Sequence, residues 1–238
     1  WLMVACWTLR RRWWKEPANA RVFIVFTLLL LAPPLSWLEY HWHMYGHPLD
    51  FLRGPYSARA IAERTTKPGS LPYPGWHHSW WAFLYYVKSA KMGAAPLRCG
   101  RWLLLMTAAG SVYMLARYRS RALPVTILFW LPIPFYTYSV AYGSVPIFLP
   151  VWFPHSFYNT RYGMEMLPAF ALFPVFAVLV AMKKWPQWGR AIPAFALALI
   201  LASNAFLVRA TPLVFQEAKV NASTRIPFER ALAQKLIL

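Results

Sequence analysis

Long runs of apolar residues alternate with short basic or polar stretches along most of the chain. Several runs approach the ~20 residues that a helix needs to cross the hydrocarbon of a bilayer. The pattern predicts an all-α fold, a polytopic bundle of five membrane spans with the tail of a sixth over residues 1–9. The five runs cover residues 22–38, 99–116, 122–140, 164–182 and 191–208.

Basic residues between the runs predict how the bundle is oriented. Short loops rich in Lys and Arg stay on the cytoplasmic side of a membrane. Three loops of this kind cover residues 10–21, 117–121 and 183–190. Because even numbers of spans separate them, they lie on one side, and segments 39–98, 141–163 and 209–238 are expected outside.

The outer segment 39–98 carries aromatic residues throughout and does not have the composition of a flexible linker. Residues 57–66 predict a short helix, and the prolines and glycines of 67–75 predict a turn-rich crossing. Apolar residues recur at helical spacing over 76–92. They predict either an amphipathic helix lying in the membrane interface or a re-entrant helix packed on the bundle.

The composition is that of a membrane protein, and this affects which partner the positive net charge indicates. The 238 residues are 59% hydrophobic and only 13% charged, whereas a soluble domain carries about 25% charged residues. A net charge of +18 would suggest nucleic acid as a partner of a soluble protein. No soluble basic domain or nucleic-acid motif carries that charge here, so membrane lipids and a phosphate-bearing ligand are the expected partners, and nucleic acid is not.

The chain opens inside an apolar run without a start methionine. We therefore expect the later part of a longer chain. The expected domains are a transmembrane bundle over 1–208, including the loop 39–98, and the truncated start of an outer segment over 209–238.

Segment 142–168 brings prolines and polar side chains together between two apolar runs. The prolines are Pro146, Pro150, Pro154 and Pro168. Each removes a backbone donor, so one continuous helix is excluded. An arginine at a membrane boundary is costly unless it faces water, protein or an anion. Arg161 is therefore expected to face the phosphate of a lipid-linked substrate, with snorkelling to headgroups or pairing with Glu165 as alternatives.

The loop 39–98 supplies weaker candidates for chemistry. Asp50 and Glu39 are candidate general bases, since a carboxylate beside a membrane can work in that role. Arg53 could bind a phosphate through two parallel hydrogen bonds, or it is an exposed loop cation. Asp50 is the only aspartate, which excludes a DxD metal–nucleotide motif.

Three histidines near Glu39 have the residue types of a metal site: His41, His43 and His47. Their spacing does not match HExxH or another zinc pattern. Histidines that support the structure or contact substrate are expected in preference to a metal site. No cofactor is assigned, and a divalent metal stays open.

The run Asn159-Thr-Arg-Tyr-Gly-Met-Glu-Met-Leu-Pro168 resembles the "RY…LP" region of the GT-C glycosyltransferases. Among these it is most similar to bacterial relatives of dolichyl-phosphate-mannose–protein mannosyltransferases and of the lipid A aminoarabinose transferase. The run Pro48-Leu-Asp-Phe-Leu-Arg-Gly-Pro-Tyr-Ser57 looks like a loop of uncharacterised bacterial members. The resemblance covers roughly residues 20–230, and the specific part is short.

The resemblance implies transfer of a sugar from a polyprenyl-phosphate donor to a glycan, lipid or protein on the outer face of the bacterial inner membrane. By position, Arg161 would bind the donor phosphate, with Tyr162 beside it. The full set of candidate substrate-binding residues is Arg161, Tyr162, Arg53, Tyr56, His155 and Asn159. The family's catalytic acid follows its first span, in a region expected to be missing here, so the catalytic residue stays unknown.

Two other functions stay open at this point. A transporter or lipid flippase would also be polytopic, but it predicts inverted repeats and polar groups at mid-membrane, and the sequence shows neither. A non-catalytic membrane assembly subunit is the second alternative. The polar groups gathered on the predicted outer side favour an enzyme over such a subunit.

Overall fold

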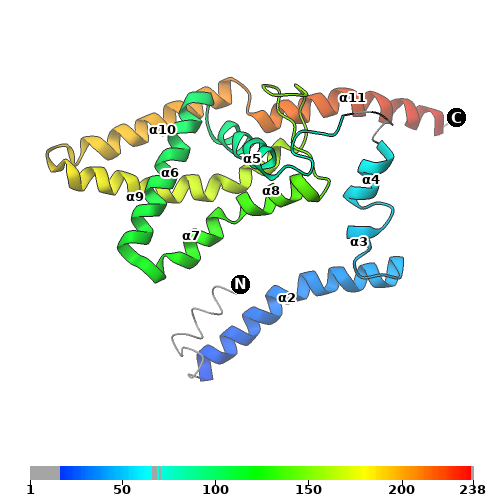
Figure 1. Ribbon diagram of the computed structural model, residues 1–238, viewed down its shortest axis with the longest axis horizontal. Coiled ribbons are helices and arrows are strands. Elements are labelled where there is room, and N and C mark those ends of the chain that lie inside the picture. The colour runs from blue at the N-terminus through cyan, green and yellow to red at the C-terminus, as the bar shows by residue number, and fades with distance from the viewer. Residues whose placement is uncertain (1–16, 66–68, 70, 237–238) are drawn as a thin grey trace. The chain divides into compact units, whose positions relative to one another are not determined.

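The computed structural model describes residues 17–65, 69 and 71–236. The chain divides at residue 70 into two compact units. The described residues form helices joined by loops, with one isolated bridge between Phe148 and Tyr158 in place of any β-strand. The predicted all-α class is thereby confirmed for this part of the chain (Figure 1).

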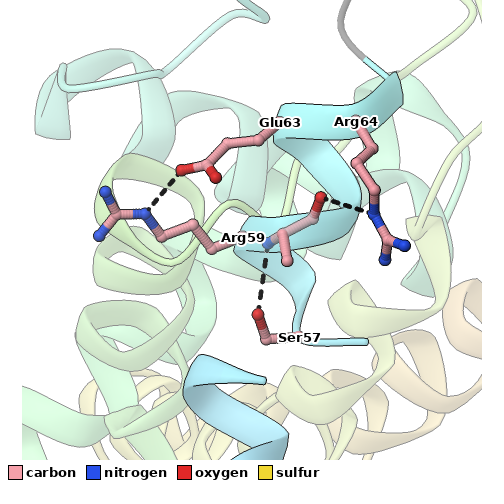
Figure 2. Close-up of polar contacts among 5 residues, drawn as sticks. Ser57, Arg59, Glu63 and Arg64 are labelled. Carbon is pink, nitrogen blue, oxygen red and sulfur yellow. Dashed lines mark hydrogen bonds and ion pairs between the residues drawn. The ribbon is translucent and has the colours of Figure 1, made fainter. Parts of the chain in front are cut away.

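The first unit contains α2 (Pro17–Tyr45), α3 (Asp50–Arg53) and α4 (Ala58–Thr65). Helix α4 confirms the short helix predicted over 57–66. The Ala60 amide donates to the Ser57 hydroxyl over 3.3 Å, which caps the first turn. One turn apart, Arg59 Nε donates to Glu63 Oε1 over 2.9 Å, and Arg64 donates to the Ala60 carbonyl (Figure 2).

The second unit holds the remaining helices. In chain order they are α5 (Ser79–Ala94), α6 (Leu97–Tyr118), η2 (Arg119–Arg121), α7 (Leu123–Trp130), α8 (Pro132–Tyr142), η3 (Thr160–Met166), α9 (Leu167–Lys184), η4 (Pro186–Trp188), α10 (Ala191–Arg209) and α11 (Leu213–Leu236). Helix α5 packs against η3 and α8. Helix α6 crosses α9 (Figure 1). The core between them includes Tyr86, Val140, Ile147, Met166 and Phe173.

A glycine allows α6 and α9 to approach closely. A Cβ atom at Gly110 would lie 1.8 Å from the Phe173 carbonyl oxygen. Small residues of this kind let membrane helices bring their backbones together. About one turn further along α6, the Tyr113 hydroxyl accepts from Lys183 Nζ of α9 over 3.1 Å.

Within the described residues, five helical segments are long and apolar enough to cross a membrane. They are Ala20–Tyr45, Arg98–Arg121, Leu123–Tyr142, Thr160–Lys184 and Ala191–Leu236. On α10 large apolar side chains face outward, with Phe195 71% and Leu201 59% exposed. Such surfaces suit lipid better than water, and the five segments indicate an integral, multi-pass membrane protein.

Two parts of the chain differ from the sequence prediction, the apolar run 122–140 and the polar tail. The run 122–140 forms α7 and α8 with a boundary at Leu131, because Pro132 begins α8 and removes a donor from the ladder. The polar tail contains the long helix α11. Helix α5 begins at Ser79 and packs on η3 and α8, and its position relative to the membrane stays a prediction.

Candidate functional site

A non-helical loop joins α8 to η3 and passes over α5. Pro146, Pro150 and Pro154 lie within it, as the sequence predicts, and the Phe153–Pro154 peptide is cis. Pro168 instead occupies the first turn of α9, where its missing donor has no intrahelical partner to lose. The Tyr85 hydroxyl of α5 donates to the Phe153 carbonyl over 2.6 Å and ties the loop to the bundle.

The end of this loop is held by a buried carboxylate from α11. Glu217 is 4% exposed. Its Oε1 accepts from the Asn159 amide over 2.8 Å, and its Oε2 accepts from the amide of Thr160 over 2.8 Å and from the hydroxyl of Thr160. The Thr160 carbonyl in turn accepts from the Ser89 hydroxyl of α5 over 2.9 Å. The start of η3 is therefore fixed to two helices at once.

Three tyrosines from α5, α8 and η3 stack beside this anchor. The rings of Tyr86 and Tyr136 lie 5.0 Å apart at 14°, and those of Tyr136 and Tyr162 lie 4.8 Å apart at 24°. Arg161 Cζ lies 5.2 Å from the centroid of the Tyr162 ring. Burial raises the pKa of Tyr86, and the charges of Tyr136 and Glu165 raise it further. Both Arg161 and Glu165 are described, and no ion pair joins them.

A second set of charges lies at the junction of α5 and α6. We call Lys88, Lys91 and Arg101 the cation cluster. Burial lowers the pKa of Lys88, and Arg101 lowers it further; burial, then Lys88 and Arg101, lower the pKa of Lys91. Lys88 Nζ also lies 5.3 Å from the ring of Trp152. Among the described residues no carboxylate pairs with any of the three cations, so a bound anion would relieve their repulsion.

An apolar groove of about 1010 Å³ runs between α6, α9 and α10. At one end, which we call the α5 end, it is lined by Ala94, Cys99 and Leu167, and at the other by Ala181 and Trp188. Its α9 wall, from Leu167 to Ala181, is about 21 Å long at 1.5 Å rise per residue. The groove is thus long, narrow and almost wholly hydrocarbon in lining.

The cation cluster adjoins the α5 end of the groove. Lys91 lies one helical turn before Ala94, and Arg101 directly precedes Trp102; Ala94 and Trp102 both line the groove. Arg161 lies six residues before Leu167, the first lining residue of α9. Lys91 and Arg101 therefore lie within a helical turn of residues at the α5 end of the groove, although none of the three cations of the cluster is itself a lining residue.

The structure brings three of the six predicted substrate-binding residues together: Asn159, Arg161 and Tyr162. Asn159 is buried, and its Nδ2 donates to the Pro146 carbonyl over 3.0 Å, so it supports the turn. His155 is exposed, and its Nδ1 lies 3.1 Å from the Pro150 carbonyl oxygen.

Arg53 and Tyr56 belong to the other compact unit. Arg53 ends α3. Tyr56 is 75% exposed, and the guanidinium of Arg64 lies over its ring at 5.9 Å. Their roles in binding substrate stay predictions.

The weaker candidates also lie in the first unit, each in a different setting. Glu39 pairs with His43 over 3.5 Å on the exposed side of α2, and Asp50 begins α3. His47 accepts from the Leu49 amide. In the described part of the chain no group of three or more His, Cys, Asp or Glu side chains could hold a metal ion.

His41 takes no part in those contacts and lies inside an aromatic cluster. The rings of Trp37, Tyr45 and Phe51 lie 4.6, 5.2 and 5.2 Å from its own. It is 6% exposed, and neither ring nitrogen has a hydrogen-bond partner among the residues that the structure describes. Its neighbours are those of a packed side chain.

Sequence reasoning missed two features of the site. Lys88 and Lys91 are three residues apart in a helical segment, which puts them on one face, but nothing in the sequence brings Arg101 to that face. Glu217 lies 57 residues from Thr160 in a polar stretch, and no local pattern marks it as buried.

Comparison of the chain with protein-family models, with curated proteins and with solved structures finds no match. The evidence for a function therefore comes from the groove, the cation cluster and the anchored η3 segment.

Proposed function

We propose that the protein is a membrane glycosyltransferase that moves a sugar from a polyprenyl-phosphate donor to an acceptor on the outer face of a bacterial inner membrane. The observation that supports this most directly is the apolar groove with the cation cluster at its α5 end. A polyprenyl phosphate has the same two parts in the same order, a long hydrocarbon tail and a terminal anion.

Each part of the donor has a matching surface. The tail lies between α6, α9 and α10, where burying hydrocarbon contributes about 0.8 kcal/mol per methylene relative to water. The phosphate lies against Lys88, Lys91 and Arg101. When the bond from sugar to phosphate breaks, the leaving phosphate gains charge, and cations already in place stabilise it more than they stabilise the bound donor.

The sugar-transfer part of the proposal draws on the η3 segment. Arg161 and Tyr162 lie in the run that resembles the GT-C glycosyltransferases, and Glu165 and the tyrosine stack add a carboxylate and aromatic faces beside them. In this arrangement Arg161 supplies a further contact to the donor headgroup. The acceptor, a glycan, lipid or protein, approaches from the outer side.

Binding of farnesyl phosphate to the protein in nanodiscs tests the donor site. Replacing all three cations of the cluster by Gln should weaken binding by well over tenfold, since hydrogen bonds to charged groups contribute about 1.5–3 kcal/mol each and a tenfold change corresponds to about 1.4 kcal/mol. The matched control removes the same charge from the predicted cytoplasmic loops through Arg117→Gln, Arg121→Gln and Lys184→Gln. Equal affinity for farnesol and farnesyl phosphate would contradict a phosphate site.

A groove-filling variant tests the tail separately. Ala171 lines the groove on α9. Ala171→Trp should weaken binding of farnesyl phosphate while leaving binding of inorganic phosphate unchanged.

Turnover separates a transferase from the two alternatives. With a polyprenyl-phosphate hexose in the same nanodiscs and a bacterial envelope extract as the source of acceptor, a transferase moves the hexose to the acceptor and releases polyprenyl phosphate, which mass spectrometry detects. A flippase moves the intact donor between leaflets without release, and an assembly subunit does neither. Movement of the intact donor between leaflets without release of polyprenyl phosphate would therefore overturn the transferase proposal.

A further inference from the structure

Glu217 accepts its hydrogen bonds from two consecutive residues of another element. Its carboxylate is 4% exposed and accepts from both amides of Asn159 and Thr160 and from the Thr160 hydroxyl. A buried carboxylate is costly unless donors replace the water it has lost. These donors come from the turn that starts η3, so α11 and this turn stabilise each other.

The turn itself needs outside support. Asn159 has φ +56°, a left-handed conformation that is costly for most residues and tolerated best by Gly, Asn and Asp. Its side chain donates to the Pro146 carbonyl, and the Ser89 hydroxyl donates to the Thr160 carbonyl. The turn is thus held by its own loop, by α5 and by α11.

The two residues that follow the turn are Arg161 and Tyr162. Immediately after them, Gly163 lies so close to α5 that a Cβ there would be 2.6 Å from the Ala90 nitrogen. The short segment between Thr160 and Gly163 is therefore clamped at both ends. The direction in which Arg161 and Tyr162 project is set by these clamps.

We infer that Glu217 is a positioning residue: it fixes the start of η3 so that Arg161 and Tyr162 face the headgroup of the donor. For the identity of that ligand the inference rests on the proposed function. Glu217 itself, buried and bound by three donors, does not touch the donor lipid. Helix α11 is accordingly part of the donor site, although its other described side chains, apart from the buried Leu213, lie near or at the surface.

A double-mutant cycle distinguishes positioning from general stabilisation. Glu217→Gln keeps the size of the side chain but turns an NH₂ donor toward amide donors. It should weaken binding of farnesyl phosphate about tenfold when Arg161 is present, the size of one lost charge-assisted contact. In the Arg161→Ala background it should cause no further loss, because coupled residues do not add. Two independent, multiplying losses would overturn the inference.

Glu229→Gln is the matched control. Glu229 is on the same helix, but its side chain is 53% exposed and pairs with Arg225. This variant should leave binding unchanged in both backgrounds. If Glu217→Gln does not accumulate in the membrane, Thr160→Val removes only the hydroxyl donor and should show the same dependence on Arg161 with a smaller effect.

Hydrogen–deuterium exchange provides a readout that needs no ligand. Glu217→Gln should speed exchange in residues 157–166 and leave α6 and α9 at the wild-type rate. If wild-type protein binds no farnesyl phosphate, the proposed function fails, and the exchange rates alone decide whether Glu217 fixes this segment. Unchanged exchange over 157–166 would overturn the role of Glu217 whatever the protein binds.

Discussion

Lys88 and Lys91 differ from ordinary surface lysines in a way that the amino-acid sequence alone does not predict. On a solvated face, two lysines one turn apart would be an ordinary pair of surface charges. Here burial and the neighbouring Arg101 lower the pKa of both amines, because the charged form is penalised by lost hydration and by like charge. A phosphate placed among these cations would favour the charged form of both amines and so oppose both effects.

This arrangement predicts that donor binding depends on pH below the range in which a free lysine titrates. At pH 7 the phosphate, with its second pKa near 6, carries almost its full charge. As the pH rises through the lowered lysine pKa values, the amines lose their protons and affinity for farnesyl phosphate should fall. The measurement is the Kd between pH 7 and about 10.4, the ordinary lysine pKa.

The control for this prediction replaces both lysines by arginine, whose guanidinium stays charged throughout that range. The Lys88→Arg, Lys91→Arg protein should bind with little dependence on pH. A decline of the same shape in both proteins would place the titrating group elsewhere. The same pKa shifts mean that the unfolded chain holds more protons than the folded one in this window, so without ligand the fold gains stability as the pH rises through it.

At the scale of elements, the positions of the helices were predictable from the sequence. The points at which a helix is interrupted, and the helices that pack against one another, were not. Apolar runs and basic loops located α6, α9 and α10 to within a few residues, because hydrocarbon length constrains such segments. The boundary between α7 and α8 at Leu131 depends on how two neighbouring prolines, Pro132 and Pro134, divide one apolar run. Sequence pattern does not decide that, since transmembrane helices tolerate proline when neighbours satisfy the freed backbone groups.

The candidate site was predictable in part for a similar reason. Arg161 and Tyr162 stand out as polar residues at the edge of a span, which is a local signal. The cation cluster and Glu217 depend on contacts between α5 and α6 and between α11 and η3, which join residues distant in sequence. Such contacts arise when the helices pack, and they cannot be predicted from a single sequence.

At the level of helix pairs, the crossing of α6 and α9 depends on Gly110. Gly110→Ala should lower the stability of the protein by about 1–3 kcal/mol, the usual cost of overpacking, because the new methyl group cannot coexist with the Phe173 carbonyl. Both helices line the groove, so donor binding should weaken as well. Thermal unfolding in detergent, followed by intrinsic fluorescence, measures the first effect.

Gly93→Ala is the comparison for this variant. Gly93 lies inside α5, and a Cβ added there would have no atom within 4 Å, so alanine should be neutral or stabilising by up to about 1 kcal/mol. Equal stability of the two variants would mean that α6 and α9 adjust to the methyl group, and that the close approach at Gly110 is not required.

For the whole molecule, function depends on which end of the bundle faces the cytoplasm. Helix α6 has 22 residues, about 33 Å at 1.5 Å per residue, which matches the hydrocarbon thickness of a bilayer. Arg101 and the α5 end of the groove lie at its start, and the basic η2 segment follows its end. The positive-inside rule predicts that η2 lies in the cytoplasm and the cation cluster outside.

Two exposed serines at opposite ends of the bundle make this orientation measurable. In a protein with Cys6→Ser and Cys99→Ala, a cysteine introduced by Ser156→Cys lies in the loop before η3, and one introduced by Ser120→Cys lies in η2. In intact bacterial cells a membrane-impermeant maleimide should label the first and not the second, and both should react after lysis. The reverse pattern would put the donor site on the cytoplasmic side and would exclude transfer on the outer face, because the α5 end of the groove, the cation cluster and η3 all belong to that one end.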